Sequence, residues 1–554
     1  MPEREILWNL GPERFFVYPV VFLALAFVIK GLYDHYRLWR IGQGPVPLDH
    51  LGQRLAAVVA FVVAQRRVSF GREPYAGLMH GLIYLGFLTL VLVTTVLAVD
   101  DWLHIMFGAH FLVGPVYLGY ALVGDLGGVA LLAGLTLAFY RRYVQQPDRL
   151  ADPSPTSDDG RALGLLAFLA VNGFAIEGVR ILLTELRDHP EWALWSPVGY
   201  LFSLFFSAFA MSDEGYRILH RVFWSAHLLT VALFLATIPT TKFAHILLST
   251  ANVFFRDPIR NTYAKGALVP IEDIEQQEVL GATKLTDFTF SQLVGFDGCT
   301  NCGRCQDNCP AYLSGKPLSP RKLVQDLRRH LLTDGRAVAA GGALPEDKPL
   351  IRGVIEEDTV WACVTCRACM EACPVLIEHI PAIVDLRRSL VMMAGSIPEM
   401  AQNALMNMER RGHPWRGTQH VRGDWMELVP GGVPEFTDGD EVEYLYWVGC
   451  TGALEDRAMK VTLSVVNVLK AAGVNFGVLG PEETCTGDPA RRMGNEFLFQ
   501  MMAQQTIEIL NSKKAKKIIT NCPHCFNTMA NEYPDFDGHF EVIHHTTFLS
   551  KLLK

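Results

Sequence analysis

Cysteine is absent from the first 298 residues of the chain, and all 12 cysteines lie between Cys299 and Cys525. Long apolar runs show the opposite distribution, because none occurs after about residue 255. The net charge is only −8 over 554 residues, so nucleic acid is not indicated as a partner. No Gly-rich dinucleotide motif is present, and we expect no NAD or FAD bound by this chain. The N-terminal segment is acidic rather than basic ahead of its apolar run, so no cleavable signal peptide is expected.

The apolar part of the chain predicts five membrane-spanning helices, since each run approaches the ~20 residues that cross a bilayer. The predicted ranges are 15–34, 75–98, 116–140, 162–185 and 219–239. A sixth run, 196–210, is short for a span and is interpreted as a helix at the outer surface or a re-entrant segment. The stretch 51–67 is apolar on one side and is expected to lie in the membrane interface.

Basic residues are concentrated in alternate loops. The first loop, the third loop and the exit from the last span carry Arg37, Arg40, Arg54, Arg66, Arg67, Arg72, Arg141, Arg142, Arg149, Arg161, Lys242, Arg256 and Arg260. The second loop carries Asp100 and Asp101 instead. By the positive-inside rule the N-terminus is outside a bacterial or archaeal plasma membrane and the C-terminus is cytoplasmic. Every cysteine then lies in the reducing cytosol, where cysteine clusters indicate metal more often than disulfides.

Three histidines in the apolar part are candidate ligands of haem b. His80 lies near the cytoplasmic start of the second span, and His227 and His245 lie 18 residues apart toward opposite ends of the fifth. Eighteen residues make five helical turns, so both imidazoles share one face. A straight helix would separate them by about 27 Å, and Pro239 is expected to bend it. We therefore predict two haems at different depths, with His80 and His245 holding the inner one.

The outer haem needs a second ligand for His227, and the candidates are His104 and His110. His220, two turns before His227, is an alternative to it. For all these residues the competing interpretation is an interfacial or satisfied polar side chain. Ionisable groups inside a membrane are costly and usually functional, which favours ligation.

Glu177 and Arg180 are a further pair of ionisable residues, one turn apart in the fourth span. They either pair with each other, hold a haem propionate, or serve proton transfer to quinone. All three interpretations remain open from the sequence.

The histidine pattern resembles the gamma subunit of respiratory nitrate reductase, a five-span cytochrome b. In that family two histidines with the same 18-residue spacing on the last span bind two haems, and two on the second span complete them. This sequence has His80 for one of the latter and Leu90 where the other would fall. The resemblance implies one or two haems b and oxidation of quinol or reduction of quinone.

Two runs of the form C-x2-C-x2-C-x3-C-P occupy residues 299–310 and 363–374. In two-cluster ferredoxins the fourth cysteine of each run ligates the cluster of the other run. The predicted ligands of the first [4Fe-4S] cluster are therefore Cys299, Cys302, Cys305 and Cys373, and those of the second are Cys309, Cys363, Cys366 and Cys369. Eight cysteines in this doubled spacing argue against zinc. The helical stretches around the runs resemble the two-cluster domain of fumarate reductase, glycerol-3-phosphate dehydrogenase and heterodisulfide reductase subunits.

Residues 443–554 alternate predicted strands and helices. Four cysteines follow the ends of these strands: Cys450, Cys485, Cys522 and Cys525. Because the carboxyl ends of parallel strands share one edge, we expect these thiols to converge as one cluster site. Asp488 and Arg491 either neighbour that cluster or cap its loop.

This segment resembles the cysteine-rich CCG domain of the D-type component of heterodisulfide reductase. Thr486 replaces the second cysteine of the Cys-Cys-Gly pair, which favours electron transfer over disulfide chemistry and leaves the cluster either cubane or noncubane. Relatives usually carry two copies of the domain, whereas this sequence contains a single copy.

The predicted fold class is a multidomain membrane protein with a five-span α-helical cytochrome b domain, an α-helical two-[4Fe-4S] ferredoxin-like domain and an α/β CCG domain. The expected boundaries are 1–255 for the membrane domain, 256–290 for a linker, 291–395 for the ferredoxin-like domain, 396–440 for a second linker and 441–554 for the CCG domain.

The combination is similar to iron–sulfur oxidoreductases associated with electron-transferring flavoprotein. We expect an enzyme within a hetero-oligomeric complex that transfers electrons between this flavoprotein, or another cytosolic redox protein, and membrane menaquinone or another quinone. The alternatives are a thiol/disulfide reductase that uses quinol, and a non-catalytic electron conduit in a larger respiratory or photosynthetic complex.

Overall fold

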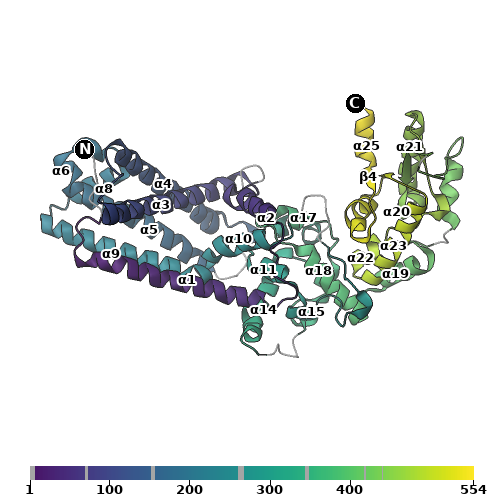
Figure 1. Cartoon of the computed structure of the whole chain (residues 1–554), viewed down its shortest axis with the longest axis horizontal. Coiled ribbons are helices and arrows are strands. Elements are labelled where there is room, and N and C mark those ends of the chain that lie inside the picture. Colours follow the sequence, from purple (N-terminus) through teal and green to yellow (C-terminus); the bar gives the residue numbers. More distant parts are fainter. Residues whose placement is uncertain are drawn as a thin grey trace. The chain divides into compact units, whose positions relative to one another are not determined.

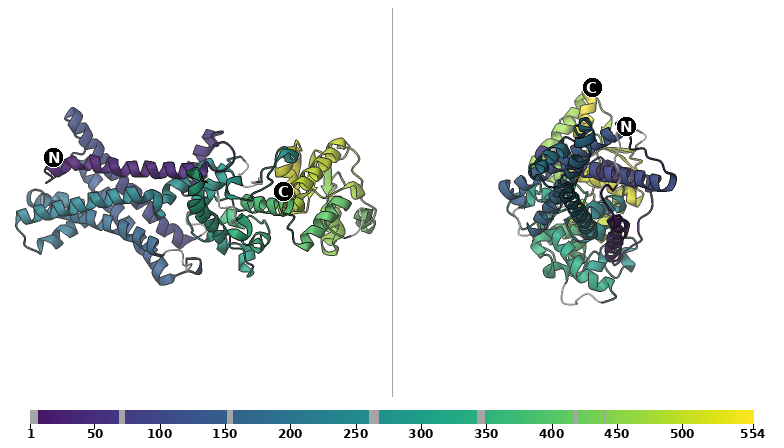
Figure 2. Two further views of the ribbon diagram at one scale, coloured as in Figure 1. Left: turned by 90° about the horizontal axis from the view of Figure 1, so that it is seen from below. Right: turned by 90° about the vertical axis from the view of Figure 1, so that its left-hand side faces the viewer.

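The computed structural model describes residues 7–68, 73–150, 156–259, 268–342, 349–416, 420–439 and 441–554. Arg72, Arg260 and parts of both predicted linkers lie outside these residues. The chain forms two compact units (Figures 1 and 2). The first comprises Met1–Arg37, Ala56–Val253 and Gly298–Arg304, and the second comprises Leu38–Leu55, Phe254–Asp297 and Cys305–Lys554.

Five helices in the described residues are long and apolar enough to span a membrane, as predicted. They are built on α1 (Val17–Trp39), α3 (Pro74–Phe107), α4 (Pro115–Phe139), α5 (Thr156–Leu183) and α9 (Asp213–Thr237). The two shorter apolar segments are also helical: α2 (Leu51–Val58), extended by a π-helical turn, and α8 (Pro197–Ser207). Short helices α6 (Glu185–Asp188) and α7 (Pro190–Ala193) connect α5 to α8.

Glycines allow α3 and α4 to pack closely. A Cβ atom at Gly86 would lie 2.5 Å from the Leu131 amide nitrogen and 2.7 Å from the Gly127 carbonyl oxygen. On α4, a Cβ at Gly128 would meet the Phe174 ring of α5 at 2.5 Å. Small residues at such contacts let helix backbones approach, which is the main source of packing between helices in lipid.

The fifth span is not the continuous helix that the histidine spacing suggested. α9 ends at Thr237, two 3-10 turns follow (Ile238–Thr240 and Lys242–Ala244), and α10 (His245–Phe255) begins a new helix. Proline lacks an N–H and ends the hydrogen-bond ladder at this point. His35 of α1 bonds the Pro239 carbonyl oxygen at 2.9 Å. His227 and His245 therefore belong to different helices, and the shared-face argument from one helix was wrong.

The second unit begins with a mainly helical region. Its principal helices are α11 (Phe290–Asp297), α14 (Pro320–Ala339), α18 (His379–Arg388) and α19 (Glu399–Arg411). The cysteine runs lie in loops and in the one-turn helices α12 (Arg304–Asp307), α13 (Pro310–Leu313) and α17 (Ala368–Ala372). The short helices α15 (Leu350–Gly353) and α16 (Glu357–Trp361) lie between the two runs. α14 and α18 fall in the two stretches that the sequence predicts as helical.

The C-terminal part of the second unit holds a parallel four-stranded sheet, in the order β2-β1-β3-β4. The strands are β1 (Tyr444–Trp447), β2 (Phe476–Gly477), β3 (Lys517–Thr520) and β4 (Glu541–His544). The first three strands were predicted, whereas β4 was missed. The helices between and after them are α20 (Gly449–Leu454), α21 (Asp456–Ala471), α22 (Asp488–Met493), α23 (Glu496–Ser512), α24 (Pro523–Asn527) and α25 (His545–Leu552).

Alternate residues of β1 pack on opposite faces of the sheet, as strand geometry requires. Leu445 and Trp447 belong to a core with residues of α23, and Tyr446 and Val448 to a core with residues of α21. Both faces of the sheet are thus covered by helices, which leaves its edges and the carboxyl ends of its strands for a site.

We predict that Gly86→Ala destabilises the membrane unit by about 1–3 kcal/mol, because the new methyl group meets backbone atoms of α4. The matched control is Gly119→Ala on α4, where a Cβ meets nothing within 4 Å. Thermal unfolding of the detergent-solubilised protein measures both. An unfolding temperature for Gly86→Ala at or above that of the unmodified protein would contradict this packing.

Candidate metal centres

Both ferredoxin-type cysteine runs adopt the same unusual backbone. The second residue after the first cysteine of each run has positive φ: Asn301 at 54° and Thr365 at 53°. The residue after the second cysteine does too: Gly303 at 76° and Arg367 at 65°. Non-glycine residues rarely adopt this conformation, and they tend to do so at functional sites. The repeated strain indicates that both loops are shaped to present their thiols.

The four thiols assigned to the second cluster lie around one small cavity. Cys309, Cys363, Cys366 and Cys369 all line it. Burial raises the pKa of the Cys369 thiol, and so does the proximity of the other three sulfurs. Thr365 N–H donates to Cys363 Sγ at 3.3 Å, the kind of bond that tunes cluster potentials. The arrangement fits the donor set of a [4Fe-4S] cluster.

The other ferredoxin-type cysteines are divided between the two units. Cys299 and Cys302 belong to the first, and Cys305 and Cys373 to the second, so their grouping as one cluster stays a prediction. Ile377 N–H donates to Cys373 Sγ at 3.3 Å, like the bond to Cys363.

The four thiols of the C-terminal domain converge at the carboxyl edge of the sheet. Cys450 and Cys485 hydrogen-bond each other, as do Cys522 and Cys525, and the charges of the two pairs interact. Gly449 has φ 76°, a conformation that side chains rarely adopt, and a Cβ there would lie 3.4 Å from Cys525 Sγ, so the loop after β1 lies against this thiol. All four cysteines of the C-terminal domain therefore lie in one group at this edge, and their role as ligands of one cluster stays a prediction.

Ionisation of two of these thiols is favoured. The hydrogen bond from Cys485 lowers the pKa of Cys450 although burial opposes it, and Arg422 contributes in the same direction. The hydrogen bond from Cys525 lowers the pKa of Cys522 to about 6. Thiolates are the form that binds metal. Among the described residues no three His, Cys, Asp or Glu side chains are spaced as ligands of a single metal ion.

Thr486 occupies the place where the CCG motif has its second cysteine. Its side chain is buried, and its Oγ1 points to Cys525 Sγ at 3.9 Å. The hydroxyl therefore replaces a thiol inside the cysteine group, rather than facing solvent.

A buried ion pair that the sequence analysis missed supports the same cysteines. Arg422 donates to Glu483, whose carboxylate accepts the N–H groups of Val448 at 2.9 Å and Gly449 at 2.8 Å. Arg422 and Glu483 are 1% and 2% exposed. Their pairing fixes the turn that precedes Cys450. A lone arginine and a lone glutamate 61 residues apart give no signal in one sequence.

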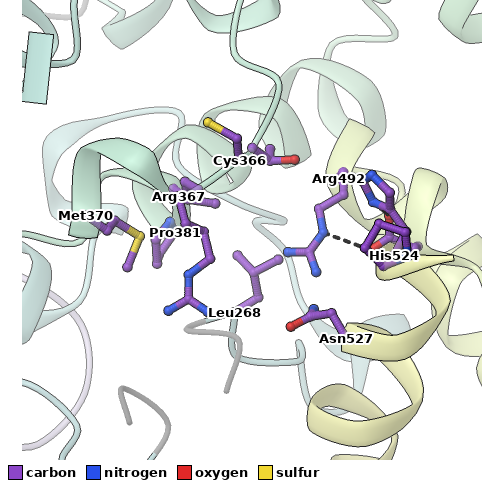
Figure 3. Close-up of a pocket in the computed structure, with 12 residues that line it drawn as sticks. Leu268, Cys366, Arg367, Met370, Pro381, Arg492, His524 and Asn527 are labelled. Carbon is purple, nitrogen blue, oxygen red and sulfur yellow. Dashed lines mark hydrogen bonds and ion pairs between the residues drawn. The ribbon is translucent and has the colours of Figure 1, made fainter. Parts of the chain in front are cut away.

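A cavity of about 220 Å³ lies between the cysteine-run loop at Cys366 and the loop at Pro523 and His524 (Figure 3). Arg367 and Arg492 point toward it from the two sides. Asp488 bonds His524 Nδ1 at 2.8 Å and Arg492 Nε at 3.0 Å. The bond to Asp488 raises the pKa of His524. The cavity is therefore lined by cationic groups and adjoins both thiol groups of the second unit.

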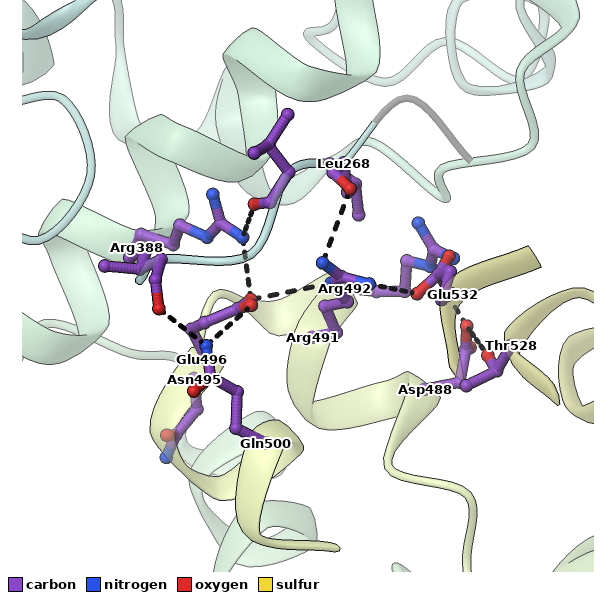
Figure 4. Close-up of polar contacts among 12 residues, drawn as sticks. Leu268, Arg388, Asp488, Arg491, Arg492, Asn495, Glu496, Gln500, Thr528 and Glu532 are labelled. Carbon is purple, nitrogen blue, oxygen red and sulfur yellow. Dashed lines mark hydrogen bonds and ion pairs between the residues drawn. The ribbon is translucent and has the colours of Figure 1, made fainter. Parts of the chain in front are cut away.

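Ion pairs beside this cavity form a network in which Arg388 links the ferredoxin-like helix α18 to the CCG domain (Figure 4). Arg388 of α18 donates to Glu496 at 2.7 Å, and Arg491 donates to Glu532 at 2.8 Å. Arg492 also pairs with Glu532. Asp488 and Arg491, expected to neighbour the cluster or cap a loop, belong to this network. Burial opposes ionisation of Asp488, but Arg492 and His524 outweigh it and lower its pKa.

In the membrane unit the structure brings His80 and His245 close enough for their charges to interact. His245 Nδ1 bonds the Lys242 carbonyl at 2.6 Å, which leaves Nε2 as its free ligand atom. His80 Nδ1 and His227 Nδ1 are buried without a hydrogen-bond partner among the described residues. Unpartnered buried imidazoles at these positions fit axial ligation of haem.

The candidates for the outer ligand are not brought to His227. His104 and His110 stack on each other with centroids 3.9 Å apart, and His110 bonds Asp100 at 3.0 Å. Phe87 of α3 contacts Phe234 of α9, so these two residues lie at the same level along the two helices. From that level His227 is ~11 Å along α9, whereas His104 is ~26 Å along α3.

The alternative ligand His220 and the position of Leu90 both have structural partners. His220 packs edge-on against Trp8. Leu90, where the related cytochromes have histidine, packs in an apolar core. Among the histidines described in the membrane unit, His80 and His245 come from different helices and lie close enough for their charges to interact.

Glu177 and Arg180 do interact, at 3.6 Å, but Arg180 has a closer partner in Glu185. Glu185 also accepts from Tyr117 at 2.9 Å. Glu177 in turn faces Asp125 of α4, a residue that the sequence analysis missed.

Two family models match the chain, a 4Fe-4S dicluster domain over residues 295–377 and a cysteine-rich CCG domain over residues 444–530. The EtfAB:quinone oxidoreductase of Syntrophomonas wolfei is 36% identical over 588 aligned residues, which cover 100% of this chain and 79% of that protein. The chain belongs to this oxidoreductase family. The probable iron–sulfur-binding oxidoreductase FadF of Bacillus subtilis is 32% identical to this chain. The alignment covers 93% of this chain and 76% of that protein.

Part of the chain also matches a component of the dihydromethanophenazine:CoB–CoM heterodisulfide reductase of Methanosarcina barkeri, with 30% identity over 48% of this chain and 66% of that protein. No solved structure matches the chain. The family and the two matched domains confirm an iron–sulfur oxidoreductase with apolar membrane helices, as the sequence predicted.

We predict that Glu483→Gln destabilises the CCG domain by about 3–5 kcal/mol, since it leaves the Arg422 guanidinium buried without a counter-charge. The adjacent Glu482→Gln is the control, because that carboxylate is 60% exposed and pairs with Lys513 at the surface. Its expected effect is below about 1 kcal/mol. Chemical unfolding followed by tryptophan fluorescence measures both, and equal effects would contradict a structural role for the buried pair.

Proposed function

We propose that this protein is a membrane-bound electron-transfer enzyme that oxidises reduced electron-transferring flavoprotein on the cytosolic side and reduces menaquinone or another quinone in the bilayer. The observation that carries the proposal is the 36% identity to EtfAB:quinone oxidoreductase, because it covers the membrane helices and the iron–sulfur domains alike.

Three thiol groups would hold three iron–sulfur clusters. Cys299, Cys302, Cys305 and Cys373 are proposed for the first cubane, and Cys309, Cys363, Cys366 and Cys369 for the second. Cys450, Cys485, Cys522 and Cys525 are proposed for the third. Four thiolates suffice for an ordinary cubane, so Thr486 is compatible with an electron-transfer cluster.

His80 and His245 are proposed to hold one haem b. The support is their mutual proximity, the buried unpartnered Nδ1 of His80 and the fixed ring orientation of His245. When bound, the clusters and the haem would supply one-electron steps between a two-electron flavin and a two-electron quinone. His227 lacks a second histidine in the described residues, so we propose a single bis-histidine haem.

The basic loops favour an orientation with the N-terminus outside and the cysteine-containing unit in the cytosol of a bacterial or archaeal cell. This orientation makes the clusters accessible to a soluble flavoprotein in the cytosol. The second partner, the quinone, lies in the bilayer. A hetero-oligomeric complex with that flavoprotein follows from the proposal.

The cavity beside Cys366 favours a second candidate, a quinol-linked thiol/disulfide reductase acting on a small anionic disulfide. Its cationic lining from Arg367, Arg492 and His524 would suit such a substrate. Thr486 counts against it, because the five-cysteine motif that cleaves disulfides is incomplete.

We predict that the purified protein catalyses menaquinone reduction by reduced flavoprotein, and that Cys485→Ser lowers the rate at least tenfold with loss of one cluster signal in EPR spectra. Thr486→Ser, which keeps the hydroxyl beside the cysteines, is the control and should retain both. Full turnover and an unchanged EPR spectrum in Cys485→Ser would contradict the third cluster. Quinol-driven disulfide reduction without flavoprotein turnover would favour the second candidate instead.

His245→Ala and His80→Ala are each expected to abolish the b-type absorption of the reduced protein while all iron–sulfur EPR signals remain. His104→Ala is the control and should retain full haem. Haem is quantified as its pyridine complex. Retention of stoichiometric haem in both variants would refute the proposed ligands.

A further inference from the structure

Asp125 and Glu177 form a pair of carboxyl groups inside the membrane unit. Asp125 lies on α4 and is 1% exposed, and Glu177 lies on α5 with a side chain that is 24% exposed. The two groups are close enough to interact directly. One oxygen of Asp125, Oδ1, is buried and has no hydrogen-bond partner among the described residues. A proton between the two carboxyls would satisfy that oxygen.

The N-terminus of α8 holds both carboxyls in place. Val198 N–H donates to Asp125 Oδ2 at 2.6 Å, and Ser196 donates to Glu177 Oε1 at 3.1 Å. A Cβ at Gly199 would lie 2.9 Å from Glu177 Cγ, so only glycine lets α8 approach this closely. The two side chains are therefore fixed opposite each other by a third helix.

The charges around the pair do not balance. The neighbouring ionisable groups on the packed elements are Arg180, Glu185 and Tyr117. Arg180 is 5% exposed and bonds Glu185, with Glu177 as its more distant partner at 3.6 Å. If Asp125, Glu177 and Glu185 were all ionised, one guanidinium would face three carboxylates. Two carboxylates in contact in an apolar site cannot both ionise without a large cost, so one keeps a proton.

The pair also lies near His227, another buried ionisable residue of the membrane unit. Gly173 is one turn from Glu177 on α5, and a Cβ there would be 3.8 Å from His227 Cε1. A helical turn is about 5.4 Å, so Glu177 and the His227 ring lie at neighbouring levels. Ionisable residues at such positions in membranes commonly belong to proton relays.

We propose that Asp125 and Glu177 share one proton and form a proton-exchange site for the quinone chemistry of the membrane unit. This inference rests on the proposed quinone reduction. A quinone takes up two electrons and two protons to become a quinol, one proton at each carbonyl oxygen. The electrons arrive from the flavoprotein donor through the chain. The pair supplies one of the two protons and is reprotonated by water before the next turnover, and water supplies the other proton to the quinone directly.

The test uses the full-length protein in lipid nanodiscs, with infrared difference spectra between its oxidised and reduced forms and the quinone-reduction rate. The unmodified protein should show a redox-linked change in the carbonyl stretch of a protonated carboxyl group. Asp125→Asn and Glu177→Gln should each remove that signal and lower the rate about 10²-fold. Flavoprotein-driven reduction of the clusters should be unchanged in both variants.

Asp213→Asn is the control, because that carboxylate is exposed and pairs with Arg187 at the surface. It should keep both the signal and the rate. Asp125→Asn also disturbs the hydrogen bond between Asp125 and Val198 of α8. In Glu177→Gln the amide oxygen still accepts from Ser196, so this variant separates an effect on proton exchange from an effect on folding.

If Glu177→Gln keeps both the infrared signal and the full rate, the shared-proton site is overturned while quinone reduction stands. If the unmodified protein itself reduces no quinone, the proposed function fails, and this inference fails with it.

Discussion

The buried pairing of arginines with carboxylates is the interaction on which the second unit depends. Arg388 with Glu496 joins the helix after the second cysteine run to the domain that carries the last four cysteines, and Arg491 pairs with Glu532 inside that domain. All four side chains are at most 5% exposed. Removing either member of such a pair leaves an uncompensated charge in a medium of low dielectric constant. The geometry between the two thiol groups is therefore set by charge balance as much as by apolar packing.

The same constraint accounts for the membrane unit. Arg180 is balanced by Glu185, and the remaining carboxyls of Asp125 and Glu177 have no second cation nearby among the described residues. The imidazole of His80, which is proposed to hold haem together with His245, keeps a buried nitrogen without a hydrogen-bond partner in that part of the chain. Groups of this kind are costly in lipid unless they bind something. A proton at the carboxyl pair and a haem iron at the histidines are the ligands that their chemistry favours.

Local patterns in the sequence predicted most of the fold. Apolar runs of sufficient length located all five spanning helices, and the cysteine spacing located both iron–sulfur domains, since each signal lies within a short stretch of chain. The break at Pro239 was only partly anticipated, because a proline predicts a bend but not the two 3-10 turns that separate α9 from α10. β4 was missed because Glu541–His544 is a short edge strand with two charged or polar residues among four.

The site was predicted less completely, since long-range contacts leave no local pattern. The pairing of Arg422 with Glu483, and the contact of Asp125 with Glu177, join residues far apart in sequence. His104 and His110 were attractive as ligands because of their depth, yet they stack on each other near the end of α3. Thr486 was interpreted correctly as a replacement for cysteine, and its side chain indeed points into the thiol group.

A redox titration of one purified, fully loaded sample, followed in parallel by EPR and optical absorption, tests the central claim most directly. The account predicts three separate iron–sulfur signals and one b-type haem in the same chain, all of them reduced by the reduced flavoprotein and reoxidised by quinone. A sample with its full complement of iron and sulfide but without haem would contradict it, because the membrane helices would then serve only as an anchor.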